Sequence, residues 1–472
     1  MIDITLIREK PDWVKEQIRK LNDDAALARV DAILALDKQR RELLTESEAI
    51  QAARNRLNKS VGRLRGDKAL DNAVRAMVAL RASEAIGEAR FDDAVGIMEN
   101  PAAQAAEGAV AADRAMDDLM TALKGMGERV EAINEDIAKV ETELEENMLW
   151  LPNLPHESVP VFPGEEHNKP WTPEGLMPEF DFEPKPHWEL GTGLDIIEFE
   201  RGVKIMGSRG YVLKGMGARL QRALINFFLD MARDKGFTEL YVPYLVKEDM
   251  MYGSAQFPKF SDVVYYDPEA DLYMLPTAEV AITNMHRDEI LDEAQLPLYY
   301  VAHTPCFRKE KMSAGRDVRG IKRVHQFEKV EMYKFTTPEN SYAELESLTE
   351  AASDVCRALK IPFRRLEIVT GDLGFAASKK YDIEMYSPGI NEWLEVSSCS
   401  NTEDFQARRA NIKYRADGQK KARFVHTLNG SGLATPRVMI AILENYQQAD
   451  GSVVIPDVLR HYMGGMEVIT KS

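Results

Sequence analysis

Residues 304–331, TPCFRKEKMSAGRDVRGIKRVHQFEKVE, form the most informative stretch of the chain. The pattern predicts a strand that ends at Arg308, a basic loop containing glycine, and a return strand carrying Arg323, Phe327 and Glu331. Residues an even number apart in a strand point to the same face, so these three side chains should share one surface with Arg308 beside them. Guanidinium groups, an aromatic ring and a carboxylate together suit a nucleoside triphosphate next to a small cationic group. An edge hairpin with a solvated run of charges is the alternative interpretation.

The composition limits the class of protein. The chain has 472 residues, enough for two or three domains, and a formal net charge of −17, which argues against indiscriminate coating of nucleic acid. Neither a signal-peptide core nor a run of about 18–20 apolar residues is present. The three cysteines are too widely spaced for a disulfide framework or a zinc knuckle. We therefore expect a cytoplasmic protein with no membrane association.

Two long helices with heptad periodicity dominate the first 150 residues. The second helix has apolar residues at alternating gaps of four and three: Leu119, Leu123, Met126, Val130, Ile133, Ile137, Val140 and Leu144. The first helix has one apolar heptad position and one partly polar companion position: Leu36, Leu43, Ile50, Leu57 and Leu64, then Ile33, Arg40, Ser47, Arg54 and Val61. This pattern predicts an antiparallel coiled-coil arm. Its basic first helix could follow phosphates, or could simply pair with the acidic second helix.

Breaks in the periodicity divide the chain. The alanine-rich residues 70–115 interrupt the heptads and predict two or three short helices at the tip of the arm. Residues 151–166 are proline-rich and predict a linker. Strands and helices then mix through residues 167–472, which we expect to form one catalytic domain of the α+β class.

Several motifs in the second part of the chain resemble those of class II aminoacyl-tRNA synthetases. A helix and strand lead to Pro243, Phe307-Arg308-Lys309-Glu310 precedes Arg323, Phe327 and Glu331, and Gly430-Ser431-Gly432 precedes Arg437. The accompanying segments TAE, EVSSCSN, DFQARR and HTLNGSG resemble the seryl-tRNA synthetase family in particular. The N-terminal arm resembles the tRNA-binding arm of that family.

The resemblance implies an antiparallel catalytic sheet flanked by helices, a homodimer and a serine–tRNA ligase activity. Such an enzyme joins serine and ATP to give seryl-adenylate and diphosphate, then transfers serine to the 3′ end of tRNA(Ser). The resemblance extends the expected partners to tRNA(Sec), and it implies Mg²⁺ as a cofactor.

The resemblance also assigns roles to residues of this sequence. Arg308 and Arg437 are the expected catalytic residues, because guanidinium groups would neutralise phosphate charge. The ATP-binding residues are expected to be Arg308, Lys309, Glu310, Arg323, Val324, Phe327, Glu395, Val396, Ser397, Ser398 and Arg437. Within this set, Phe327 should stack on adenine and Glu310 should contact the adenine amino group.

Glu395 and Ser398 are the expected Mg²⁺ residues. A carboxylate, a hydroxyl group and phosphate oxygens are suitable ligands for this hard cation. A spacing of three residues, however, puts the two side chains on opposite faces of a regular strand. The sequence therefore requires either a β-bulge or the end of a strand between them.

Serine binding is expected from a second set of polar positions. This set contains Thr277, Ala278, Glu279, Arg308, Glu331, Asn429 and Ser431. A buried polar pocket would reject alanine because its groups would lose their partners. The sequence leaves open which carboxylate would hold the serine amino group and which the hydroxyl group. Thr277 has an alternative role as the N-cap of the next helix.

The expected tRNA contacts lie in two regions. The basic first helix of the arm supplies Arg40, Arg41, Arg54, Arg56 and Lys59. The loop of the hairpin, residues 311–322, is expected to be mobile and to meet the acceptor end of tRNA.

Two other functions fit parts of the pattern. An amino acid ligase that loads a carrier protein would share the catalytic motifs but would lack the long arm. A non-catalytic paralogue would have lost the motif arginines and glutamates, which are intact here.

Overall fold

The computed structural model describes residues 1–104, 112–311 and 319–471. The chain forms two compact units. One contains Met1–Leu27 together with Leu149–Ser472 and is called the catalytic unit below; the other, Ala28–Met148, is called the arm. The first 27 residues thus group with the catalytic unit, whereas the sequence placed them with the arm.

The arm is built on two long helices, α3 (Asp24–Gly66) and α6 (Ala112–Leu149). All eight apolar heptad residues expected in the second helix are buried, which confirms the pairing seam. The seam on α3 differs from the prediction in its first half. Leu36 and Leu43 are only half-buried, whereas Asp37 and Ser47 are buried. The hydroxyl group of Ser47 lies 3.1 Å from Oδ1 of Asn134 on α6, so polar contacts replace apolar packing at this level.

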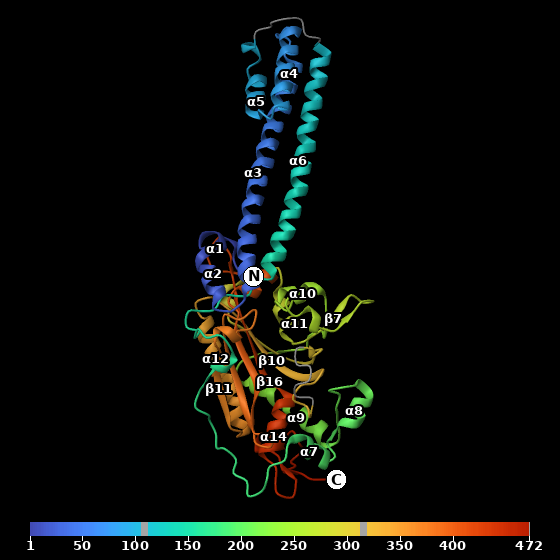
Figure 1. Cartoon of the computed structure of the whole chain (residues 1–472), viewed down its shortest axis with the longest axis vertical. Helices are drawn as coiled ribbons and strands as arrows, with labels where there is room; N and C mark the ends of the chain where they lie inside the picture. Colours follow the sequence, from blue (N-terminus) through green and yellow to red (C-terminus); the bar gives the residue numbers. More distant parts are fainter. Residues whose placement is uncertain (105–111, 312–318, 472) are drawn as a thin grey trace. The chain divides into compact units, whose positions relative to one another are not determined.

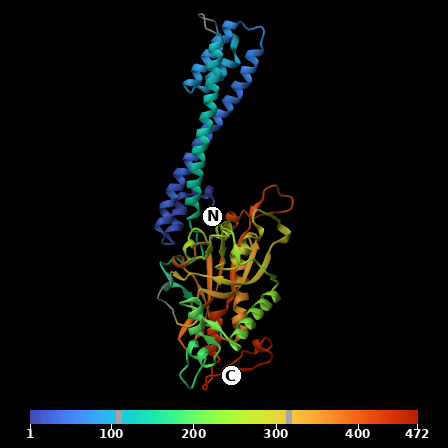
Figure 2. The same cartoon turned by 90° about the vertical axis from the view of Figure 1, so that its right-hand side faces the viewer.

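The described part of the alanine-rich insertion up to residue 104 folds as short helices, as predicted. They are α4 (Asn72–Gly87), α5 (Phe91–Glu99) and a single 3₁₀ turn, Pro101–Ala103. Small residues of α4 are buried along most of its length and share one apolar cluster with α3, α5 and α6. Figures 1 and 2 show α4 and α5 beside the same end of the α3–α6 pair. The arm therefore has a four-helix core at that end.

An eight-stranded sheet forms the centre of the catalytic unit, in the order β1-β11-β12-β13-β16-β10-β9-β4. Neighbouring strands are antiparallel except for β4 and β9, which are parallel. The bounds are β1 Lys169–Pro170, β11 Phe363–Glu367, β12 Lys379–Ser387, β13 Glu392–Asn401, β16 His426–Ala434, β10 Gln326–Thr336, β9 Leu298–Phe307 and β4 Thr238–Leu240. The predicted antiparallel sheet flanked by helices is confirmed.

Three helices cover one face of this sheet: α9 (Met216–Asp234), α12 (Ser341–Leu359) and α14 (Thr435–Asn445). Figure 1 shows them beside β10, β11 and β16. Alternate residues such as Val330 and Met332 of β10 enter the large apolar core under these helices. The intervening residues of β10 point to the other face, which is left for the site.

Shorter elements surround the sheet. The helices are α1 Ile4–Glu9, α2 Pro11–Arg19, α7 His187–Gly193, α8 Phe199–Met206, α10 Glu248–Gly253, α11 Glu279–Thr283, α13 Phe405–Ala410 and α15 Asp457–Arg460. The small sheets pair β2 Ile197–Glu198 with β3 Val212–Leu213; β5 Leu245–Val246 and β6 Tyr266–Asp267 with β7 Leu272–Met274; β8 Ile290–Asp292 and β15 Arg423–Phe424 with β14 Lys413–Arg415; and β17 Val453–Val454 with β18 Val468–Ile469. Within the described residues, no helix has the length and apolar character needed to cross a bilayer.

The hairpin predicted from residues 304–331 is present as β9 and β10, with Phe307 opposite Gln326. The prediction was wrong about Arg323, because β10 begins at Gln326 and Arg323 lies in the loop before it. Phe327 and Glu331 are in the strand and share a face, as expected from their even spacing.

Candidate active site

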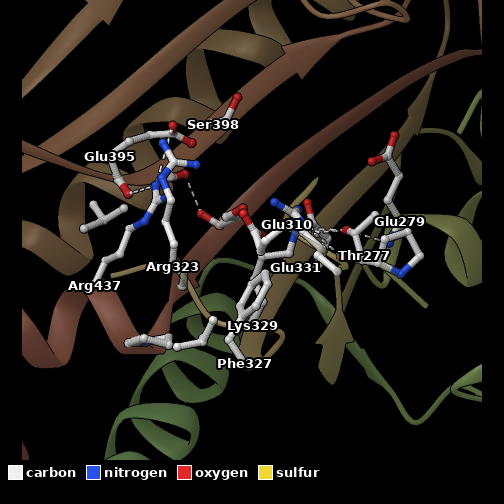
Figure 3. Close-up of a pocket in the computed structure, with 18 of the residues that line it drawn as sticks. Thr277, Glu279, Glu310, Arg323, Phe327, Lys329, Glu331, Glu395, Ser398 and Arg437 are labelled. Carbon is white, nitrogen blue, oxygen red and sulfur yellow. Dashed lines mark hydrogen bonds and ion pairs between the residues drawn. The ribbon is translucent and has the colours of Figure 1, made fainter. Parts of the chain in front are cut away.

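A cavity of about 550 Å³ lies on the face of the sheet opposite the three helices. Arg308 lines this cavity, as do fourteen more of the predicted serine- and ATP-binding residues: Thr277, Glu279, Glu310, Arg323, Val324, Phe327, Glu331, Glu395, Val396, Ser397, Ser398, Asn429, Ser431 and Arg437. The main contributors are β10, β13, β16 and the start of α14. Figure 3 shows Arg323, Arg437, Glu395 and Ser398 at one end and Thr277 and Glu279 at the other.

The face of β10 that lines the cavity supplies an aromatic ring and then two charges. Phe327, Lys329 and Glu331 occupy alternate positions and all line the cavity. The Lys329 ammonium group pairs with the Glu331 carboxylate and donates a 2.8 Å hydrogen bond to the hydroxyl group of Thr277. Sequence reasoning missed Lys329, although its even spacing from Phe327 and Glu331 was sufficient to place it on this face.

A β-bulge resolves the conflict in spacing between Glu395 and Ser398. The pairing of β13 with β12 shifts so that Glu395 lies opposite Glu384 while Ser397 lies opposite Ile383, which leaves Val396 as the extra residue. The bulge returns Ser398 to the same face as Glu395. Ser398 lies opposite Asp382 of β12, a residue that the sequence did not identify.

Two arginines, Arg323 and Arg437, concentrate positive charge at this end of the cavity. The Arg437 guanidinium group donates a 2.6 Å hydrogen bond to the backbone carbonyl of Glu395 and lies 3.6 Å from its carboxylate. Enclosure by protein raises the pKa of Glu395, but Arg437, Lys380, Arg308 and Arg323 outweigh that effect and lower it. Glu395 is therefore an anion at neutral pH.

Arg308 stands next to the aromatic ring of the cavity. Its guanidinium carbon lies 5.2 Å from the centroid of the Phe327 ring, and its Nε atom is 3.4 Å from the carbonyl oxygen of Pro276. Cation–π contact at this distance holds the planar group over the ring. The guanidinium group therefore lies between the residues of the two ends, close to both β10 and the segment before Thr277.

The other end of the cavity is polar and almost fully buried. Thr277, Glu279 and Glu331 are all less than a tenth exposed. The hydroxyl group of Thr277 lies 3.1 Å from a carboxylate oxygen of Glu331. Burial, followed by the nearby charge of Glu331, raises the pKa of Glu279 to about 7. Ala278 occupies the N-cap position of α11, but the Thr277 hydroxyl group accepts a 3.4 Å hydrogen bond from the backbone N–H of Glu279, so Thr277 also contacts the start of that helix.

Two of the predicted residues do not line the cavity. Ala278 is fully buried in an apolar cluster. The Lys309 ammonium group lies 5.7 Å from the centroid of the Tyr265 ring, and its backbone N–H donates to the carbonyl group of Val263. Most of the loop expected to be mobile, residues 312–318, lies outside the described residues.

The five predicted tRNA-binding residues lie on α3 of the arm, and four of them contact the arm itself. Arg40 pairs with Glu141, Arg41 with Asp37 and Arg56 with Glu99. The Arg54 guanidinium group packs against Gly127 of α6, so closely that a side chain at that position would collide with it. Lys59 is exposed.

The chemistry available in this cavity is electrostatic. Cationic groups and an aromatic ring at one end can hold a nucleotide, while two buried carboxylates and hydroxyl groups at the other can hold a small polar molecule with an amino group. In the described part of the chain, no three His, Cys, Asp or Glu side chains form a cluster able to hold a metal ion. The three cysteines are free and buried.

Comparison with known proteins agrees with this geometry. Residues 260–446 match the tRNA synthetase class II core domain (G, H, P, S and T), and residues 1–89 match the seryl-tRNA synthetase N-terminal domain. A serine–tRNA ligase of Roseiflexus sp. (strain RS-1) is 53% identical over all 472 residues, with 100% of both chains covered. A serine–tRNA ligase of Herpetosiphon aurantiacus is 50% identical, over 99% of this chain and 100% of the relative.

A solved structure also matches the complete chain. Seryl-tRNA synthetase from Pyrococcus horikoshii, complexed with ATP, gives a TM-score of 0.86 at 35% identity and covers 100% of both chains. Full-length identity near one half and the motif residues gathered in one cavity point to the same family. The chain belongs to the seryl-tRNA synthetase family, within class II of the aminoacyl-tRNA synthetases.

Proposed function

We propose that the chain is a serine–tRNA ligase. It joins serine to ATP, forming seryl-adenylate and releasing diphosphate, and then transfers serine to the 3′ end of tRNA(Ser). One observation carries the proposal: a single cavity joins an arginine-rich, aromatic end to a small, buried end lined by carboxylates. ATP fits the first end and serine the second.

The adenylation step needs positioning and charge neutralisation more than covalent catalysis. A serine carboxylate oxygen attacks the α-phosphorus, and diphosphate leaves with the electrons of the broken bond. Arg308 is the proposed link between the substrates, because its planar fork can bind the serine carboxylate and the α-phosphate together. Arg323 and Arg437 would neutralise the leaving diphosphate, and Phe327 would stack on adenine.

Mg²⁺ is the proposed cofactor at the arginine-rich end. Glu395 and Ser398 share a face through the bulge at Val396, and the adjacent Asp382 has a buried carboxylate oxygen without a hydrogen-bond partner. These oxygen donors fit a hard cation that would also take phosphate and water ligands. When bound, the ion would supply further neutralisation of phosphate charge.

Serine selection is assigned to the buried end of the cavity. Glu279, Glu331, Thr277, Asn429 and Ser431 would surround the amino and hydroxyl groups. Alanine would leave these buried groups unpaired, and threonine would be excluded by its extra methyl group.

The arm is the proposed binding element for tRNA. Lys59 is exposed and free to meet phosphates, and Arg40, Arg41 and Arg56 could exchange their internal partners for phosphate groups. The resemblance to this family extends the proposed substrates to tRNA(Sec). The proposed role in protein synthesis supports a cytoplasmic location.

A homodimer is the proposed assembly. Tyr241, just after the edge strand β4, is 88% exposed, and Ile205 of α8 is 77% exposed. An open strand edge and large exposed apolar groups are typical of surfaces that a second copy covers. Sedimentation equilibrium should therefore give a mass of 2 × 53.3 kDa; a single-chain mass would contradict the assembly.

The two alternatives are less well supported. A carrier-protein ligase would have no use for the arm, whose sequence is matched over its full length by the relatives. In a non-catalytic paralogue, the motif residues would not be expected to survive together around one cavity.

Serine-dependent exchange of pyrophosphate into ATP tests the proposal. We expect exchange with the wild-type chain and a loss of about 100-fold or more in Arg308→Ala. Arg357→Ala is the matched control, because Arg357 also lies over a phenylalanine ring, at 5.7 Å, but belongs to a surface ion-pair group. No exchange in the wild-type chain would remove the enzyme interpretation, and exchange without charging of tRNA would favour the carrier ligase.

A further inference from the structure

The serine end of the cavity is supported from behind by a buried glutamine. Gln406 is the second residue of α13, is 0% exposed and does not line the cavity. Its side-chain amide nevertheless reaches Glu279, which does line the cavity. No part of the proposed chemistry uses Gln406 directly.

The hydrogen bonds of Gln406 fix the orientation of its amide. The Tyr333 hydroxyl group and the Thr427 hydroxyl group each donate to Oε1 over 2.8 Å. On the other side, Nε2 donates to the carbonyl group of Ser254 over 3.0 Å and to the carboxylate of Glu279 over 2.6 Å. If the amide were flipped, Oε1 would face these two acceptor oxygens, so only one orientation satisfies every partner.

The partners come from four separate parts of the fold. Tyr333 belongs to β10, Thr427 to β16 and Glu279 to α11, while Ser254 follows α10. All of these residues are buried. Gln406 therefore links the Glu279 carboxylate, which the short helix α11 carries, to strands β10 and β16 of the sheet.

The position of Glu279 matters because a second carboxylate lies near it. Glu331 is balanced by Lys329, whereas Glu279 receives its N–H donors from Gln406 and Asn429. A buried anion without such donors would either take up a proton or move toward another partner. Either change would remove a fixed acceptor from the serine end of the cavity.

We propose that Gln406 is a positioning residue for serine: it holds the Glu279 carboxylate in the orientation that receives the polar groups of the amino acid. This inference rests on the proposed function. Gln406 touches neither substrate, and it acts entirely through Glu279. Its effect therefore belongs to the binding of the amino acid and not to the binding of ATP.

The test measures the KM for serine and the KM for ATP separately by pyrophosphate exchange. Gln406→Met keeps the length of the side chain but removes the donor to Glu279. We expect its KM for serine to rise about 10- to 100-fold, the effect of losing one hydrogen bond to a charged group, and its KM for ATP to change less than about twofold. Gln447→Met is the matched control. Gln447 is also buried, and its side-chain amide makes two hydrogen bonds to the backbone of Lys185, away from the cavity.

A second variant guards against misfolding of the first. Tyr333→Phe removes one of the hydroxyl donors that orient the amide, and Tyr333 does not line the cavity. We expect a smaller rise in the KM for serine, about two- to fivefold, because Thr427 and, at 3.3 Å, Thr402 still donate to Oε1. Thermal unfolding of every variant shows whether the fold is retained.

The outcomes separate this inference from the proposed function. If the wild-type chain exchanges pyrophosphate with serine but folded Gln406→Met and Tyr333→Phe keep the wild-type KM for serine, Gln406 has no positioning role. Equal increases in the two KM values would also overturn it, since they indicate general damage to the cavity. Absence of exchange in the wild-type chain contradicts the proposed function instead.

Discussion

Two neighbouring carboxylates, Glu279 and Glu331, share one cation at the serine end of the cavity. Lys329 pairs with Glu331, so the cost of burying charge falls mainly on Glu279. Burial and the charge of Glu331 raise the pKa of Glu279 to about 7 from 4.5. The amino group of serine would bring the second cation that this pair of carboxylates lacks.

Glu279 should make the stability of the chain depend on pH. Between about pH 4.5 and 7 the folded chain keeps a proton on Glu279 that the unfolded chain releases, so the free energy of unfolding falls as pH rises through this window. The shift corresponds to a fall of about 3 kcal/mol. In Glu279→Gln this part of the fall should disappear. Urea unfolding at pH 5 and pH 8 measures it; identical pH dependence in the two proteins would contradict the assignment.

Asp382 should influence Mg²⁺ through Ser398 and Glu395. Burial raises its pKa to about 6, against the attraction of Lys380, so it is mainly ionised at pH 7.5. Replacing it by asparagine removes a negative charge beside the proposed metal site. For Asp382→Asn we expect the Mg²⁺ concentration at half-maximal exchange to rise about tenfold, with the KM for serine unchanged.

The control for the Asp382 variant is Asp354→Asn, which alters a carboxylate in a surface group with Lys235 and Arg357. A normal Mg²⁺ requirement in Asp382→Asn, or an equal change in the control, would argue against a metal at this site.

At the scale of elements, alternation along β10 predicted correctly that Phe327 and Glu331 share a face, because period two is a local property of a strand. The residue at which a strand begins depends also on its pairing with neighbouring strands, and Arg323 was wrongly placed inside β10, which begins at Gln326. The spacing of Glu395 and Ser398 required either a β-bulge or the end of a strand, and the choice of a bulge at Val396 depends on pairing with β12. Asp382 and Gln406 could not be found at all, because their roles arise only from contacts between distant segments.

A buried carboxylate joins the helix that carries Arg437 to the end of the hairpin loop. Glu444 of α14 accepts from the backbone and ring of His187 and from Ser387, Gly389 and Ile390. The other ring nitrogen of His187 accepts from the backbone N–H of Ile321 over 3.2 Å. This network holds Ile321, near the C-terminal end of the loop, next to α14.

Glu444→Gln should destabilise the catalytic unit strongly. Both carboxylate oxygens accept hydrogen bonds, so an amide in either orientation turns its NH₂ group toward donors. We expect a loss of about 3 kcal/mol in the free energy of unfolding, because buried donors are left unpaired. Glu350→Gln, on the surface of α12, is the comparison. Urea unfolding measures both, and a loss below about 1 kcal/mol in Glu444→Gln would show that the network is dispensable.

At the scale of the whole molecule, the two units have separate cores. The arm buries its own seam and tip cluster, and the cavity is built from residues of the catalytic unit alone. The sequence predicted the coiled coil and the tip helices from periodicity and alanine content. It did not predict that residues 1–27 group with the catalytic unit, because that grouping depends on contacts such as the one between Arg408 and Asp3.

Removal of the arm should separate the two reactions. A chain in which a short glycine linker replaces residues 28–148 keeps every residue that lines the cavity. We expect pyrophosphate exchange within about twofold of the full chain and a loss of about 100-fold or more in the charging of tRNA(Ser), because the phosphate contacts are gone. Charging at the normal rate would show that the arm does not bind tRNA.

The account rests most heavily on one claim, that the small buried end of the cavity holds serine while the arginine-rich end holds ATP. Pyrophosphate exchange measured on the full chain with each of the twenty amino acids in turn tests it directly. The predicted result is rapid exchange with serine and at least about 100-fold slower exchange with alanine and threonine. Equal exchange with alanine, or faster exchange with any other amino acid, would contradict the assignment of the cavity.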